Sequence, residues 1–163
     1  MTKIHHINCG TLLVPNFPTV VCHCLLLEDN SRLALVDTGI GLLDVQSPVE
    51  RLGQQLIDMA AFQFHEDDTA VRRIEQLGFL ADDVRHIMLT HGDPDHAGGL
   101  ADFPNATVHV SAEEQAHCQS GHWRYITRHF EHQPRWQSYT KSSRTWFGME
   151  ARPVLAGSPR RSC

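Results

Sequence analysis

Two things that the sequence lacks exclude whole classes of protein. It has no apolar run of the roughly 18 residues that a membrane-spanning helix needs, and its start, MTKIHHINCG, has no apolar signal core. It also has no cluster of Lys and Arg, and its formal charge is −5, whereas proteins that bind nucleic acid through phosphate charges are basic. We therefore expect a cytoplasmic protein with no membrane segment and no nucleic-acid partner.

The cysteines follow no disulfide or zinc-knuckle spacing. The cysteines are odd in number: Cys9, Cys22, Cys24, Cys118 and Cys163. Cys22 and Cys24 lie two positions apart in an apolar run, so both thiols point to one face if that run is a strand. We expect buried structural thiols.

The chain is large enough for one packed domain. Hydrophobic residues make up 41% of its 163 positions, and a chain of this size buries roughly 68–70% of its unfolded surface. Residues 152–163 have no periodicity and are rich in Pro, Gly and Ser. We assign residues 1–157 to a single domain and residues 158–163 to a disordered tail.

Hydrophobic periodicity predicts strands alternating with helices, which is typical of an α/β or α+β layered fold. Residues 19–28 and 33–36 predict a hairpin, residues 84–89 and 106–110 two further strands, and residues 69–77 a helix that ends at Gly78. Ser111 and Glu114 match a capping box that opens a helix ending at Gly121.

Two regions are less regular. Pro48 interrupts residues 42–63, which we interpret as a loop with one or two short helices. Beyond Gly121, scattered aromatic residues indicate a partly helical segment. His5, His6, His23, His86 and His109 lie in or near the predicted strands, where we expect them on strand faces rather than on a metal.

Histidine is frequent, with 12 residues, and two of them fall in one short cluster with two acids: His91, Asp93, Asp95 and His96. If the extended geometry of residues 84–90 persists, positions 91, 93 and 95 project to one side. Pro94 favours extended backbone at Asp93, and Gly98-Gly99 permits a tight turn. Neighbouring carboxylates repel each other without a cation, so the cluster predicts a divalent metal site.

The cluster His91-x-Asp93-x-Asp95-His96-x-Gly98-Gly99, with Val36-Asp37-Thr38-Gly39 upstream, resembles the metallo-β-lactamase superfamily, and especially its lactonase-like branch. The resemblance implies an αββα sandwich with two metals at one edge. It implies a metal-activated hydroxide that attacks a lactone or ester carbonyl of a small-molecule substrate.

The same resemblance implies roles for single residues. His91 and Asp93 would bind the first metal and Asp95 and His96 the second, with Asp95 also the catalytic residue that passes a proton to the leaving group. Asp37 would brace the loop that carries these ligands. Zinc is the expected metal, but the family has His where this chain has Asp93, and this oxygen ligand also suits manganese or iron.

The family's remaining ligands, a third His, a bridging Asp and a final His, have no counterpart in the sequence. No Asp follows Asp102, and His122, His129 and His132 fall in the predicted helical segment. The resemblance covers about residues 4–157 and matches the N-terminal half of the family domain. We therefore expect a sandwich truncated to about its first half, with weak metal binding, slow turnover and self-association through the unpaired sheet.

Two alternatives remain open. The chain could be an inactive metal-binding remnant, or an interaction module that exposes Trp136 and Trp146. Residues 35–39 also resemble the catalytic turn of aspartic proteases, but a partner segment is missing and the 91–96 cluster would be unexplained. The choice between a lactone, an ester and a thioester depends on the loops over residues 42–63 and on the missing half.

Overall fold

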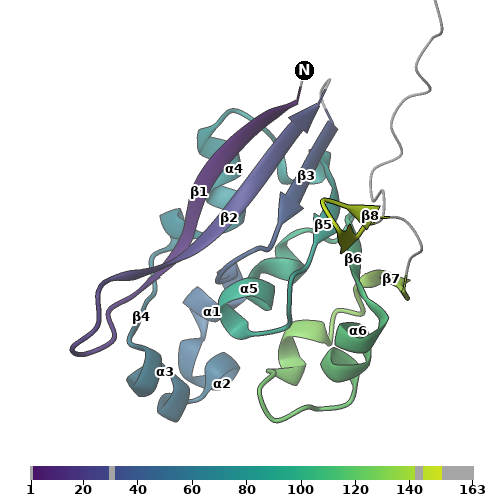
Figure 1. Ribbon diagram of the computed structural model, residues 1–163. Coiled ribbons are helices and arrows are strands. Elements are labelled where there is room, and N and C mark those ends of the chain that lie inside the picture. Colours follow the sequence, from purple (N-terminus) through teal and green to yellow (C-terminus); the bar gives the residue numbers. More distant parts are fainter. Residues whose placement is uncertain (1, 30–31, 142–144, 152–163) are drawn as a thin grey trace, which may run out of the picture.

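A computed structural model describes residues 2–29, 32–141 and 145–151. These residues form a seven-stranded mixed sheet in the order β4-β1-β2-β3-β5-β6-β7, and a separate two-stranded sheet, β8-β9 (Figure 1). The predicted tail, residues 158–163, lies outside the described residues. No helix among the described residues is long and apolar enough to cross a membrane.

One half of the large sheet is antiparallel. It consists of β1 (Lys3–Leu12), β2 (Val20–Asp29), β3 (Arg32–Val36) and the short β4 (Phe62–Gln63). In the hairpin of β2 and β3, Leu26 lies opposite Leu35. The predicted hairpin is therefore confirmed.

The other half is parallel and is built from β3, β5 (Val84–Met88), β6 (Thr107–Ser111) and β7 (Arg135–Tyr139). The connecting helices are α4 (Ala70–Gln76), α5 (Pro94–Ala97) with η3 (Gly98–Asp102), and α6 (Ala112–Gln119). The predictions for residues 69–77, 84–89 and 106–110 are confirmed. Strand β7 was not predicted, because we interpreted the region beyond Gly121 as partly helical; η4 (Thr127–Phe130) is its helical part.

Residues 42–60 form three short helices rather than one or two: α1 (Leu42–Gln46), α2 (Pro48–Leu52) and α3 (Gln54–Ala60). Pro48 starts α2 instead of breaking a helix, since the first helical turn needs no N–H donor there. Figure 1 shows the three helices grouped together below the long strands β1 and β2. The remaining short elements are η1 (Glu66–Asp68), η2 (Ala81–Asp83), β8 (Thr145–Trp146) and β9 (Met149–Glu150).

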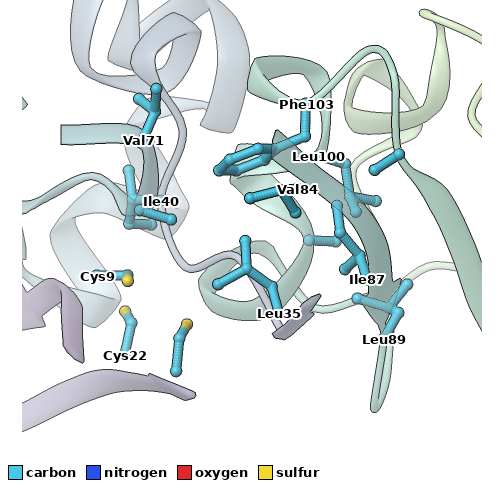
Figure 2. Packing of buried hydrophobic residues seen from close by; sticks show 14 of the residues in the cluster. Cys9, Cys22, Leu35, Ile40, Val71, Val84, Ile87, Leu89, Leu100 and Phe103 are labelled. Atoms are coloured by element: carbon cyan, nitrogen blue, oxygen red, sulfur yellow. The ribbon is translucent and has the colours of Figure 1, made fainter. Parts of the chain in front are cut away.

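The main core lies between the helices and one face of the sheet. Leu35, Val84, Ile87, Leu100 and Phe103 gather in one group from strands, from η3 and from the residue after η3 (Figure 2). The free thiols of Cys9, Cys22, Cys24 and Cys118 are buried, and burial raises the pKa of Cys22 far above its usual value. The expectation of buried thiols is confirmed for these four; Cys163 lies outside the described residues.

The opposite face of the sheet is less well covered. Leu25, Leu27, Val36 and Met88 on this face are half-buried, and Val21 is 46% exposed. Self-association through this face stays a prediction.

The aromatic residues beyond Gly121 differ from the expectation. Trp136 is half-buried and packs against Phe130, with ring centroids 5.9 Å apart, so it is not an exposed docking side chain. Trp123 is instead 86% exposed. The side chain of Trp146 is outside the described part of the structure.

Candidate metal centre

The candidate site lies where two parallel strands end. Val36 of β3 pairs with Met88 of β5, so the residues after both strands meet at the same edge of the sheet, where ligands bind in open α/β folds. Asp37 follows β3, and Thr90 and His91 follow β5. The N–H of Asp37 donates to the carbonyl of Met88 at 3.0 Å, which fixes the two chain ends side by side.

The extended geometry of residues 84–90 does not persist through the whole cluster. Pro94 occupies the first position of α5, so Asp95 and His96 lie on a helical turn. Asp93 has the extended backbone that Pro94 favours, and its carbonyl accepts the N–H groups of His96 and Ala97, both at 2.9 Å. Proline is favourable at the first position of a helix as well as in an extended turn. Here Pro94 starts α5, so the residues that follow it are helical.

Asp37 connects the two parts of the site. One carboxylate oxygen accepts the N–H of Thr90 at 2.8 Å, and the other accepts the Thr90 hydroxyl at 2.7 Å. The second oxygen also lies 2.8 Å from His96 Nδ1. The buried carboxylate of Asp37 thus holds both the turn after β5 and the imidazole on α5.

Both imidazoles of the cluster are arranged in the same way. Nδ1 of His91 lies 3.0 Å from the Thr90 hydroxyl, and Nε2 lies 3.2 Å from Asp93 Oδ2. Nδ1 of His96 faces Asp37, and Nε2 lies 3.5 Å from Asp95 Oδ2. The two rings are adjacent, with centroids 3.9 Å apart.

The electrostatics of α5 favour the charged forms of both His96 and Asp95. Burial opposes a positive charge on His96, but the carboxylates of Asp37 and Asp95 outweigh it and raise the pKa of this imidazole to about 10. Burial likewise opposes the ionisation of Asp95, but the contact with His96 holds the pKa of this carboxyl below its usual value. Asp95 is therefore ionised near neutral pH.

Gly98 and Gly99 are required because two backbones approach each other closely there, and not because the chain makes an unusual turn. Gly98 has a helical backbone, and the N–H of Gly99 donates to the carbonyl of Gly39 at 3.1 Å. A Cβ at Gly99 would lie 2.8 Å from the Thr38 carbonyl oxygen, and one at Gly98 would lie 2.5 Å from Asp44 Oδ2. The segment after β3 can pack on α5 only because both residues lack a side chain.

Sequence reasoning missed two residues next to the cluster. Arg124 donates from Nε to Asp93 Oδ1 at 3.1 Å and from Nη2 to the other oxygen. Glu114 accepts the N–H of Gly92 at 2.7 Å. Ser111 caps α6 by accepting the Glu114 N–H at 3.1 Å, as predicted, but the Glu114 carboxylate turns to Gly92, so the capping box is only half formed.

Five of the other histidines form contacts away from the cluster. His6 and His23 pair across β1 and β2 at 2.9 Å. His86 Nδ1 lies 2.9 Å from His109 Nε2, and His109 Nδ1 lies 2.7 Å from the Tyr139 hydroxyl. His129 is fully buried, with Nε2 3.0 Å from Asp44 Oδ1.

The donor types of the cluster suit a divalent cation, since imidazole Nε2 atoms and carboxylate oxygens already face each other in two pairs. In the part of the chain that the structure describes, however, no group of three or more His, Cys, Asp or Glu side chains is arranged to hold a metal ion. The cluster thus offers its ligands in two pairs, His91 with Asp93 and Asp95 with His96. The roles of these residues as metal ligands stay predictions.

A mixed sheet with this strand order, and with a His/Asp cluster where its parallel strands end, is typical of metallo-β-lactamase-like folds. The model of the metallo-beta-lactamase superfamily matches residues 18–138, and the chain belongs to this superfamily.

Among curated proteins, a probable metallo-hydrolase of Mycobacterium tuberculosis is 41% identical over 160 residues, which is 93% of this chain and 50% of that protein. An N-acyl homoserine lactonase of Bacillus thuringiensis is 31% identical over 91 residues, 56% of this chain and 36% of that protein. The chain spans about half the length of the first of these relatives.

Solved structures show the same fold. A structure of an N-acyl homoserine lactone hydrolase with the product N-hexanoyl-L-homoserine bound at the catalytic metal center has a TM-score of 0.68 at 21% identity. The match covers 91% of this chain and 63% of that one. A structure of a mutant of the B. thuringiensis protein AiiA with N-decanoyl-L-homoserine bound at its active site gives a TM-score of 0.71 at 21% identity and the same coverage.

Proposed function

We propose that the chain is part of a metal-dependent hydrolase that opens a lactone or a related ester. The observation that carries this proposal is the Asp37 carboxylate, which ties Thr90 and His96 together at the strand ends. Metal-binding imidazoles are commonly oriented in this way, through Nδ1 to a carboxylate, so that Nε2 is free for the metal. The distant lactonases support the substrate class.

Each residue of the cluster has a place in this proposal. His91 and Asp93 would hold one divalent cation, and Asp95 and His96 a second. Zinc is our first choice, and manganese or iron suit the carboxylate of Asp93. When bound, such a cation would polarise a carbonyl group and make water acidic enough to yield hydroxide near neutral pH.

The chain's own residues contribute to the reaction by transferring a proton and by orienting His96. Asp95 is ionised near neutral pH, so its carboxylate can accept the proton that the attacking water loses and then deliver it to the departing alkoxide of the opened ester. Asp37 keeps His96 in one orientation throughout. The site needs ligands beyond these four, so we expect slow turnover by the 163-residue chain.

The direct test measures metal and activity on the same sample. The purified chain is loaded with Zn²⁺ or Mn²⁺, its metal content is determined, and hydrolysis of an N-acyl homoserine lactone is followed with and without EDTA. We expect bound metal, slow hydrolysis and its loss with EDTA, and we expect Asp95→Asn to abolish hydrolysis. Rapid hydrolysis that EDTA and Asp95→Asn leave unchanged would contradict the proposal.

One observation favours a second candidate, a metal-binding remnant without activity: the described residues offer His and Asp ligands in two pairs, and no group of three or more is arranged to hold a metal ion. The same experiment separates the two. Metal that binds, needs His96 and supports no hydrolysis at any substrate concentration would favour the remnant. Asp82→Asn, an exposed change on η2, serves as the control in both assays.

A further inference from the structure

The carboxylate of Asp93 already has a cationic partner within the chain. The guanidinium of Arg124 engages both of its oxygens as a fork, and His91 Nε2 lies 3.2 Å from Asp93 Oδ2. Paired, two-pronged contacts of this kind are the strongest that arginine makes with a carboxylate. Both oxygens that a metal ion would use at this position are therefore shared with a positive charge.

Arg124 reaches the site from residues 121–126, which connect α6 with η4. The neighbouring Tyr125 packs on the turn below it, since a Cβ at Gly92 would lie 3.1 Å from the Tyr125 ring. Trp123, on the other side of Arg124, is 86% exposed. The connection is thus attached to the cluster through Arg124 and Tyr125, while Trp123 faces solvent.

We propose that Arg124 is a built-in counter-cation of Asp93, which competes with a divalent cation for this carboxylate. This inference rests on the proposed function. A cation bound between His91 and Asp93 would lie next to the guanidinium, and like charges at this distance repel each other. Metal binding therefore withdraws Arg124 and shifts the connection of residues 121–126.

A different role for Arg124 would have the opposite effect. If the guanidinium held Asp93 in the orientation that a metal needs, its removal would weaken metal binding. The geometry favours competition, because the arginine fork uses both oxygens of the carboxylate instead of bracing one and leaving the other free.

The first measurement is calorimetric titration of the metal-free chain with Zn²⁺ alone. The substitution Arg124→Gln removes the ion pair with Asp93, in which both groups are partly exposed. It also removes the repulsion between the guanidinium and the incoming cation. We therefore expect Arg124→Gln to bind Zn²⁺ about two- to tenfold more tightly than the unaltered chain.

Arg128→Gln is the matched control. Arg128 is on η4, is exposed to a similar degree and pairs with Glu50 on α2, so this variant removes the same charge without touching Asp93. We expect its Zn²⁺ affinity to stay unchanged. In an Asp93→Asn background, Arg124→Gln should give no gain, because the carboxylate over which the two cations compete is gone.

The second measurement follows the connection itself. Zn²⁺ should change the tryptophan fluorescence of the unaltered chain, and Trp123→Phe should remove this change. In Arg124→Gln the change should be smaller, since the connection is already released. This readout reports movement and is independent of hydrolysis.

The outcomes distinguish the two proposals. If the unaltered chain binds Zn²⁺ and Arg124→Gln binds it equally or less tightly, Arg124 is not a competing cation, and the proposed function is unaffected. If neither protein binds Zn²⁺, the proposed function fails and the competition fails with it. Binding by Arg124→Gln alone would support both.

Discussion

At the scale of single residues, Asp37 combines an unusual backbone with a demanding set of partners. Its φ of 57° lies in the left-handed region, which costs most residues about 1–2 kcal/mol but is tolerated by Asp and Asn. Its two carboxylate oxygens bond Thr90 and His96, and the residue is buried. The position thus requires a short side chain with two accepting oxygens.

We expect Asp37→Asn to weaken Zn²⁺ binding about ten- to hundredfold and to lower the free energy of unfolding by about 1–3 kcal/mol. Asn suits the backbone, so the loss comes from replacing an oxygen by an NH₂ group that cannot accept the bonds of Thr90 and His96. Zn²⁺ titration and urea unfolding measure the two effects. Unchanged Zn²⁺ affinity would show that Asp37 does not orient a ligand.

Asp102 at the end of η3 is a second acid with an unusual environment. Burial, with the charge of Asp44 in addition, raises the pKa of Asp102 to about 7, although one oxygen accepts the N–H of Leu42 at 3.0 Å. The unfolded chain loses this proton near pH 3.9. Between about pH 4 and 7 the folded chain binds more protons than the unfolded one, so this acid lowers stability as the pH rises through that range.

Asp102→Asn should therefore raise the free energy of unfolding at pH 8 by about 1–2 kcal/mol and change it little at pH 4. The amide oxygen still accepts the Leu42 N–H, and no charge is buried. Urea unfolding at both pH values measures the difference. Asp58→Asn, an exposed change on α3, should have no such effect; equal stability of Asp102→Asn and the unaltered chain at pH 8 would refute the explanation.

How much of the site could be predicted depends on sequence distance. His91 to His96 lie in six positions and follow a strand, so their proximity could be read from the sequence. The contact of Asp93 with Arg124 joins residues 31 positions apart, through a connection without regular periodicity. Nothing in the local pattern indicates that this arginine turns back to the cluster.

At the scale of elements, the site depends on how closely the segment after β3 approaches α5 and η3. The hydrogen bonds from Thr38 N–H to the His96 carbonyl at 2.9 Å and from Gly99 N–H to the Gly39 carbonyl at 3.1 Å join the two backbones. This contact sets the position of Asp37 relative to His96.

Gly99→Ala should consequently destabilise the chain by about 1–3 kcal/mol, because its Cβ would lie 2.8 Å from a backbone oxygen of Thr38 that cannot rotate away. Thermal unfolding measures the loss. The control is Ala101→Ser in the same η3, which also adds one heavy atom but lines a cavity of about 240 Å³. A Gly99→Ala variant as stable as the control would show that the two backbones can separate without cost.

Elements with strong local signals were predicted, and those defined by tertiary contacts were not. The helix from Ala70 to Gln76 has a regular apolar face and a glycine after its end. Strand β7 has only Trp136 and Tyr139 as partly buried residues, and it is a strand because β6 supplies its hydrogen-bonding partner. Pro48 marked a helix start that we interpreted as an interruption.

At the scale of the whole molecule, the two faces of the sheet differ. One face carries the core, while the other is only half-buried at Leu25, Leu27, Val36 and Met88. Relatives of known structure are longer than this chain, which covers 63% of the N-acyl homoserine lactone hydrolase. This face of the described sheet therefore leaves apolar side chains partly exposed to solvent, and exposed apolar surface promotes association.

We expect the purified 163-residue chain to associate with itself as its concentration rises, which sedimentation velocity measures. Val21 is 46% exposed on the less covered face, so Val21→Lys places a charge there and should shift the equilibrium toward the monomer. Val49→Lys on α2, where the side chain is 56% exposed, adds the same charge elsewhere and should leave association unchanged. A monomer at all concentrations would show that the apolar surface is too small or too well covered to drive association. Equal effects of both lysines would instead assign any association to net charge, since only Val21 lies on the sheet.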